Sequence, residues 1–163
     1  KTPTNTRTPS RTPTPTNTKL PSATPAYTKV TVYFVNKAKY NANTPPFEVE
    51  GKRYASSSAD FAKFVLDEYF KGPGLTEKND YGWIAVFSGL TGYSKFEVKD
   101  GVAHIYLKGT CNSAGREYNL ADILMVNLKQ FNSRIQFVKI YDENGSTQIP
   151  DGASDSIPAC LAP

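Results

Sequence analysis

The sequence predicts an α+β fold, a two-layer sandwich in the order β-α-β-β-α-β with two helices packed on one mostly antiparallel sheet. Three observations support this prediction. Segments 58–71 and 119–132 repeat apolar residues at helical spacing, and Asp100-Gly101 has the composition of a hairpin turn. Segments 29–36 and 134–141 are rich in β-branched and aromatic residues, as strands are. Each element has one clearly apolar side, so the helices must cover the sheet.

The first strand is expected at 29–36, because its apolar residues alternate between two faces. Residues 40–46 are expected to form a loop. Residues 47–54 are then expected to form a short edge strand around Val49. The side chains that share one face of the first strand are Val30, Val32 and Phe34.

The first helix is expected at 58–71, with Ser57 or Ser58 as its cap and Asp60 in its first turn. Gly72-Pro73 ends it, because proline cannot continue a helix. Its broad apolar face contains Phe61, Ala62, Val65, Leu66, Tyr69 and Phe70.

The next two strands form a hairpin over 96–107, closed by Asp100-Gly101 as a two-residue turn. Such a turn fixes the register of the strands on either side. We therefore expect four facing pairs: Val98 with Ala103, Phe96 with Ile105, Glu97 with His104, and Lys95 with Tyr106.

Asn119 is expected to cap the second helix, with Asp122 in its first turn. The last strand follows at 134–141, where adjacent Phe137 and Val138 interrupt the alternation and leave its inward face undecided. A turn then occupies 142–146. The apolar stripe of the second helix contains Leu120, Ile123, Leu124, Leu128 and Phe131.

Residues 1–28 differ from the rest, with ten Thr, six Pro, four basic residues and no acid. We expect them to be a disordered stalk or linker before a domain at 29–163, because such a segment buries little apolar surface. The net charge of +4 lies wholly in this segment, which argues against a basic nucleic-acid-binding domain. No apolar run is long enough to span a membrane.

One histidine and two cysteines exclude metal sites that need several such ligands, and no cofactor motif is present. A disulfide between Cys111 and Cys160 is the simplest interpretation in an exported chain, and it would pin the C-terminal extension to the domain. Two free buried thiols, or a catalytic cysteine with His104 as its base, are the alternatives.

Several segments together resemble the GerMN domain, the sporulation and spore germination domain of bacterial envelope proteins. They are VTVYFV at 30–35, FKGP at 70–73, GVAHIYL at 101–107, Gln130-Phe131, and FVKIYDENG at 137–145. The resemblance covers about residues 29–145. It implies a small α/β sandwich in an extracytoplasmic, often lipid-anchored protein with no established catalytic site.

Few residues have the spacing of a reactive site. His104 is an acid/base candidate that Glu97 would orient across the hairpin, and the alternative is an exposed cross-strand pair. In the turn at 142–146, only Asp142 and Asn144 match a calcium loop, so a plain turn is favoured. We therefore expect no catalytic residue and no metal ligand.

The Gly-rich stretch at 74–93 is the one candidate ligand surface, because Tyr81, Trp83 and Tyr93 could present flat rings to a sugar or peptide. Alternatively, these rings and Phe87 cover the core beneath the first helix.

Together with the resemblance, these observations predict a non-enzymatic module outside the cytoplasm, anchored to the membrane on the cell surface. A lipid anchor upstream of Lys1 would supply that attachment, and the sequence leaves open whether one precedes it. It would work by protein–protein association, with envelope proteins or with itself, through an edge strand or open sheet face. The alternative is a module that binds cell-wall or surface glycan through the aromatic stretch. An envelope hydrolase is a third hypothesis, and it needs carboxylates that folding brings together.

Overall fold

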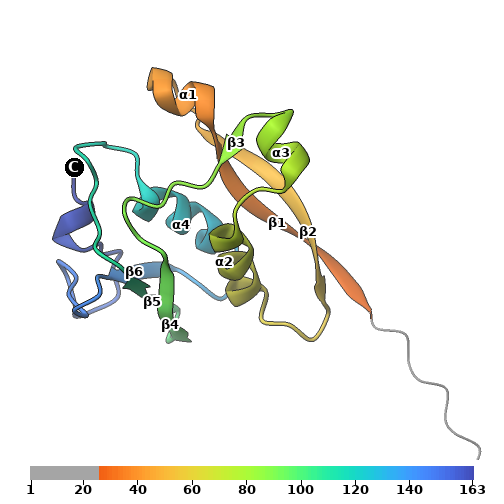
Figure 1. Cartoon of the computed structure of the whole chain (residues 1–163). Coiled ribbons are helices and arrows are strands. Elements are labelled where there is room, and N and C mark those ends of the chain that lie inside the picture. Colours follow the sequence, from red (N-terminus) through yellow and green to blue (C-terminus); the bar gives the residue numbers. More distant parts are fainter. Residues whose placement is uncertain (1–25) are drawn as a thin grey trace, which may run out of the picture.

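The computed structural model describes residues 26–163 (Figure 1). Most of the stalk predicted at 1–28 lies outside the described residues. The first strand, β1, spans Tyr27–Asn36 and so begins two residues before the expected Lys29.

β1 is the central strand of the first sheet. It pairs antiparallel with β2 (Glu48–Ser56) on one side and with the short β3 (Trp83–Ile84) on the other, in the order β2-β1-β3. The segment 47–54 is therefore an edge strand, as predicted, although it extends to Ser56. Alternate β1 residues, Val32 and Phe34 among them, are fully buried.

Helix α1 (Lys37–Ala42) occupies part of the segment that was predicted to be a loop. The Asn36 side chain caps it by accepting a hydrogen bond from the Lys39 amide, and Asn43 ends it in the left-handed conformation. The helix has no buried residue, so it has no apolar periodicity from which the sequence could predict it.

β4 (Gly92–Lys99), β5 (Val102–Lys108) and β6 (Phe137–Tyr141) form the second sheet, in that order. The predicted hairpin register is confirmed at all four pairs, because Asp100 and Gly101 both take the positive φ angles that a tight turn of this twist requires. β6 runs parallel to β5.

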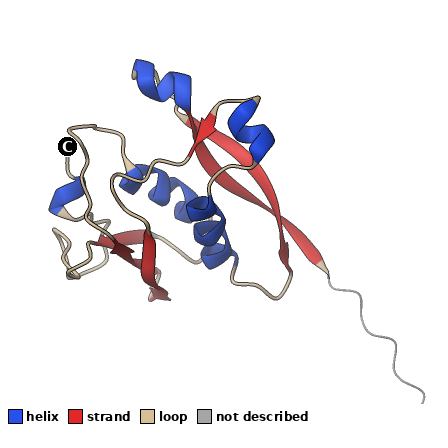
Figure 2. Cartoon of the chain, viewed as in Figure 1, coloured by secondary structure: helices blue, strands red, loops and turns tan. Residues whose placement is uncertain are grey.

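The α+β class is confirmed, with two helices packed against the strands. The strands, however, form two three-stranded sheets instead of the single sheet that we expected. Helices α2 (Phe61–Lys71) and α4 (Leu120–Lys129) lie between the two sheets (Figures 1 and 2). α4 packs on both β1 and β6, which its buried surface allows because Ala121 and Asn127 are buried beside the predicted stripe. A helix that is buried on more than one side can pack on two sheets.

The cap of α2 is Asp60, not Ser57 or Ser58. The Asp60 carboxylate accepts hydrogen bonds from the amides of Ala62 and Lys63, and Arg134 also pairs with it. An aspartate fits this position well because its charge also complements the helix dipole.

Helix α3 (Leu75–Asn79) was not predicted. It starts directly after Gly74, whose amide donates to the Glu77 carboxylate at 2.7 Å. Like α1, it has no buried residue and hence no apolar pattern.

The irregular alternation of the last strand has a structural cause. Val138 and Ile140 face the core, whereas Lys139 and Tyr141 are buried on the opposite side. The C-terminal segment pairs with the edge of β6, where the Ser156 amide donates to the Val138 carbonyl. It also covers that side, since the Lys139 ammonium donates to the carbonyls of Ile149 and Asp151. Both faces of β6 are therefore covered.

Cys111 and Cys160 are joined by a disulfide, with Cα atoms 5.7 Å apart, which is the predicted pairing. It holds the short 3₁₀ helix η1 (Ala159–Leu161) against the domain, where Leu161 is fully buried. None of the helices of residues 26–163 has the length and hydrophobicity to span a bilayer.

Candidate functional site

Tyr81 and Trp83 lie together at the surface, beside β3. Their ring centroids are 5.7 Å apart, and Tyr81 is 59% exposed. Trp83 is half-buried, because its other side packs on Phe34 with 6.5 Å between centroids. Trp83 therefore serves the core and the surface at once.

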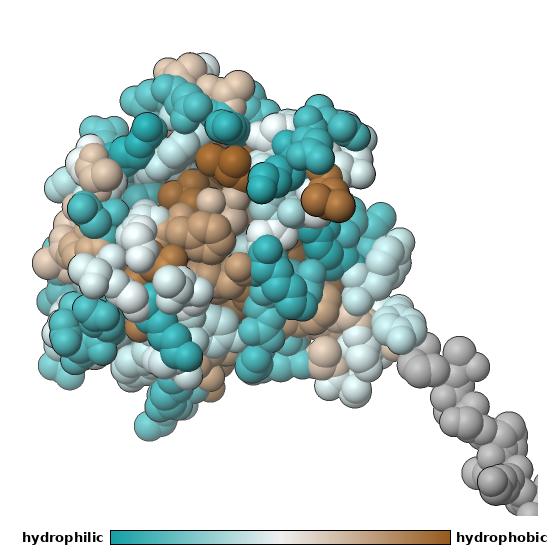
Figure 3. Space-filling model, in the orientation of Figure 1, coloured by the Kyte–Doolittle hydropathy of each residue, from teal (hydrophilic) through white to brown (hydrophobic). Residues whose placement is uncertain are grey.

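A shallow hollow of about 260 Å³ adjoins Trp83, and it is lined also by Pro73, Phe87 and the side chain of Lys71. Phe87 is partly exposed, so this hollow presents apolar surface to solvent. Figure 3 shows apolar residues gathered near the centre of the face that it draws, with hydrophilic residues around them.

Tyr93 lines a second hollow, of about 770 Å³, and does not touch Tyr81 or Trp83. Phe70 is adjacent to its ring, with centroids 5.8 Å apart. Lys71 lines both hollows. Of the three predicted ligand-binding residues, Trp83 and Tyr93 thus line two different hollows that share Lys71, while Tyr81 lines neither and contacts Trp83.

The Tyr93 hydroxyl donates a hydrogen bond to Asp67. Burial, followed by this carboxylate, raises the pKa of Tyr93 above its usual value. Asp67 also pairs with Lys63 at 2.8 Å. The larger hollow therefore carries a neutral phenol at ordinary pH.

Each lysine around the larger hollow has an acidic partner. Lys63 pairs with Asp67, Lys71 with Glu68, and Lys95 with Glu97. The local charge is therefore balanced, which favours an uncharged ligand over a polyanion.

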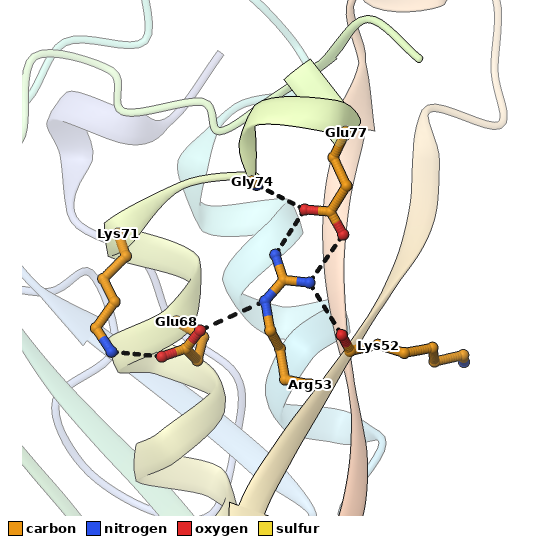
Figure 4. Close-up of polar contacts among 6 residues, drawn as sticks. All are labelled: Lys52, Arg53, Glu68, Lys71, Gly74 and Glu77. Carbon is orange, nitrogen blue, oxygen red and sulfur yellow. Dashed lines mark hydrogen bonds and ion pairs between the residues drawn. The ribbon is translucent and has the colours of Figure 1, made fainter. Parts of the chain in front are cut away.

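A second polar cluster ties β2 to α2 and α3 (Figure 4). Arg53 donates from Nη1 and Nη2 to the two oxygens of Glu77, at 2.8 and 2.6 Å, and its Nε lies 3.4 Å from Glu68. The guanidinium also lies over the Phe34 ring, 5.3 Å from its centroid. The negative charges of Glu68 and Glu77 compensate the positive charges of Arg53 and Lys71. The cluster is therefore structural rather than a site with an unpaired charge.

Hydrogen bonding to Glu77 raises the pKa of Arg53, and the same contact holds the pKa of Glu77 below its usual value. Sequence reasoning did not single out this cluster. The spacing of Gly74 and Glu77, typical of a helix start, was the one signal that could have indicated it.

His104 faces Glu97 across the hairpin, as predicted, but the two side chains are not paired. His104 Nδ1 lies 3.0 Å from the Tyr141 hydroxyl, whereas Glu97 pairs with Lys95. Burial is the main cause that lowers the pKa of His104. Glu97 therefore does not orient His104 as the acid/base hypothesis requires.

The turn at 142–146 is held by its own backbone. Asp142 Oδ1 accepts hydrogen bonds from the amides of Asn144 and Ser146, both at 2.9 Å. Among residues 26–163, no three His, Cys, Asp or Glu side chains are grouped so as to hold a metal ion.

The β2 edge is an open interaction surface. The Asn36 amide donates to Phe47 and the Ser57 amide to Ala26, so odd-numbered β2 residues exchange hydrogen bonds with β1. Even-numbered residues consequently direct their N–H and C=O groups out of the sheet. These residues are Glu48, Glu50, Lys52, Tyr54 and Ser56.

The opposite edge, on β1, is partly blocked. The Asn127 side chain accepts from the Tyr33 amide at 2.8 Å and donates to the Tyr33 carbonyl at 2.9 Å. Gln130 donates to the carbonyl of Thr31. Among the described strands, β2 pairs only with β1, so its outer edge faces no other strand.

Neither a protein-family model nor a curated protein matches the sequence. The structure is similar to the tandem GerMN domains of the sporulation protein GerM from Bacillus subtilis, with a TM-score of 0.50 and 18% identity. The match covers 85% of this chain and 49% of that one, so this chain spans about half the length of the structure it matches. The chain therefore has a GerMN-like fold.

Proposed function

We propose that the chain is a non-enzymatic binding module that works outside the cytoplasm by protein–protein association. The β2 edge is the observation that carries this proposal. Backbone groups that point out of a sheet bind another strand through main-chain hydrogen bonds, which is a common mode of protein recognition. The GerMN-like fold supports a role related to sporulation.

The side chains along this edge leave room for a partner. Tyr54 is 67% exposed, and the side chains of Glu50 and Lys52 are 56% and 41% exposed. Below them, the Arg53 cluster anchors β2 to two helices, so the strand is held in place before it binds. A pre-ordered strand loses little conformational entropy on association.

The Cys111–Cys160 disulfide supports the proposed location. Disulfides persist in oxidising compartments and are rare in the cytosol. On this proposal a lipid anchor holds the module at the membrane, and residues 1–28 separate the domain from it. Membrane fractionation of the native protein, with and without lipase treatment, tests the anchor.

The proposed function is tested by crosslinking native cells and isolating this chain under denaturing conditions. The expected result is a crosslinked product with a second copy or another envelope protein, lost when Tyr54→Pro blocks the edge. Proline removes one outward N–H, and Thr28→Pro on β1 is unsuitable as a control because it breaks the sheet. Tyr54→Ala, which removes the same side chain but keeps the outward N–H, is the closer control. A product that survives Tyr54→Pro contradicts association at this edge.

A glycan-binding module is the second candidate, favoured by the adjacent rings of Tyr81 and Trp83 at the surface. Tyr81→Ala is the better test, since Trp83 also packs on the core. Tyr27→Ala is a matched control, because Tyr27 is similarly exposed, at 64%, on β1. Retention on purified cell wall that is lost in the first variant alone supports this function, and equal retention in both contradicts it.

A further inference from the structure

We propose that two copies of this chain join through antiparallel pairing of their β2 strands, with Glu50 of each copy opposite Lys52 of the other. The inference rests on the proposed function, and it names both the partner and the register. Three observations carry it: β2 is the edge strand of its sheet, only its even-numbered residues direct backbone groups outward, and its exposed face carries opposite charges.

Parity restricts the registers that are available. In an antiparallel pair, residues that exchange hydrogen bonds lie directly opposite each other. Only the even-numbered residues of β2 direct backbone groups outward, so even-numbered residues must face one another in the pair. The pair must also be symmetric, because both copies use the same edge.

Charge then selects one register. A pair centred on Glu50 places two glutamates opposite each other beside two Glu48–Lys52 pairs, and one centred on Lys52 places two lysines opposite each other, so each contains a like-charge contact at its centre. A pair centred on Gly51 instead forms two Glu50–Lys52 contacts. Within each copy Lys52 already pairs with Glu50, so the four side chains alternate in charge around the symmetry axis.

Gly51 suits the centre of such a pair. It is buried, and a Cβ atom there would come within 3.0 Å of the Phe34 ring and 3.1 Å of Glu77. Packing within the same copy therefore accounts for this glycine, and the register rests on parity and charge. Beside Gly51, the Lys52 carbonyl accepts from Arg53 Nη1 at 3.1 Å, and Arg53 keeps both Glu77 contacts if a second copy takes that carbonyl.

The pair joins two three-stranded sheets into one of six strands, with the order β3-β1-β2 continuing into its symmetric copy. A single edge contact is smaller than a stable interface, so we expect weak association, with a Kd on the order of 100 µM. A membrane that confines the chain raises its local concentration and compensates for this weakness.

Sedimentation equilibrium of the full chain tests the register through a charge swap. Glu50→Lys places lysines opposite one another at both symmetric contacts, and the expected result is a Kd raised roughly tenfold. The double variant Glu50→Lys with Lys52→Glu restores opposite charges and is expected to return the Kd to near that of the unchanged chain. Both substituted positions are exposed, and circular dichroism confirms that each variant folds.

Cysteine crosslinking tests the same register by distance. A chain with Glu50→Cys mixed with a chain with Lys52→Cys is expected to form an intermolecular disulfide, because hydrogen-bonded pairs have Cα atoms about 5.5 Å apart. Either variant alone is expected to crosslink far less, since identical positions lie diagonally across the pair. Equal crosslinking in the mixed and separate samples overturns the register.

The outcomes also separate this inference from the proposed function. If the chain self-associates with a Kd that the charge swap does not change, the register is wrong and the proposed function still stands. A chain that remains monomeric but crosslinks to another envelope protein through β2 overturns the second copy as partner, and again leaves the proposed function standing. A monomeric chain with no crosslinked partner contradicts both.

Discussion

The carboxamide of Asn127 forms both backbone hydrogen bonds of Tyr33, in place of a neighbouring strand. Its oxygen accepts from the Tyr33 amide and its nitrogen donates to the Tyr33 carbonyl, while the second N–H reaches Ile123 in the same helix. Asn127 is fully buried, and every hydrogen-bonding group of its side chain is used. Helix α4 thereby blocks the β1 edge, and the first sheet keeps its outer edge at β2.

Replacement of Asn127 is therefore expected to destabilise the fold. Asn127→Ala leaves the Tyr33 backbone groups without this partner and opens a small cavity, so the free energy of unfolding should fall by about 2–3 kcal/mol. Gln130→Ala, which removes a longer, partly exposed bond to Thr31, should cost less than about 1 kcal/mol. Urea unfolding measures both, and equal losses would contradict this account of the β1 edge.

The Arg53–Glu77 contact predicts a specific response to acid. Because the folded state holds the pKa of Glu77 below its usual 4.5, the ionised carboxylate stabilises the fold above that pH. The stabilisation disappears as the pH falls through the lowered pKa. Glu77→Gln should cost about 2 kcal/mol at neutral pH and progressively less below pH 4.5.

The matched control is Glu50→Gln, because Glu50 forms an exposed ion pair with Lys52 on β2, the strand that carries Arg53. In dilute protein this change should cost less than about 0.5 kcal/mol. Unfolding curves across the acidic range measure both variants. A Glu77→Gln deficit that stays constant down to strongly acidic pH would argue against the ionic contribution.

The disulfide is expected to contribute substantially to stability. It closes a loop of 49 residues, which corresponds to roughly 4 kcal/mol in the chain-entropy model. The double variant Cys111→Ser with Cys160→Ser should lose up to this amount in thermal or urea unfolding. Intact mass of the native protein provides the direct check, since two reduced thiols would refute the crosslink.

The His104 environment predicts a titration below the usual pKa of 6.5. Burial disfavours the imidazolium, and Lys139, Lys95 and Lys99 add to this effect while Glu97 opposes it. Stability contributed by the neutral ring is therefore present above pH 6.5 and declines on acidification. NMR titration of the imidazole signals measures the pKa, and Glu97→Gln should lower it further. A pKa above 6.5 would contradict the dominance of burial.

The parts of the fold that depend on local chemistry were predictable. The β4–β5 register follows from Asp100-Gly101 alone, and Asn119 caps α4 as its position before the apolar stripe indicates. Whether the strands form one sheet or two depends on contacts between distant segments. The burial of α4 on more than one side decides this, and a stripe of five apolar residues did not reveal it.

The candidate site was predictable only in part, for similar reasons. Tyr81 and Trp83 are close in sequence and lie together, whereas the turn between β3 and β4 carries Tyr93 to a separate hollow. Val49 correctly indicated an edge strand. The sequence could not identify the outward-facing residues, because their parity depends on how β2 pairs with β1.

Amide chemical shifts measured over a concentration series test the central claim most directly. Between about 10 µM and 1 mM, a range that spans the expected Kd, the account predicts progressive shifts at the amides of Glu50, Lys52 and Tyr54. Signals around the two hollows should stay constant. Shifts that centre on Tyr81 or Tyr93, or a spectrum that does not change with concentration, would contradict self-association through the β2 edge of this chain.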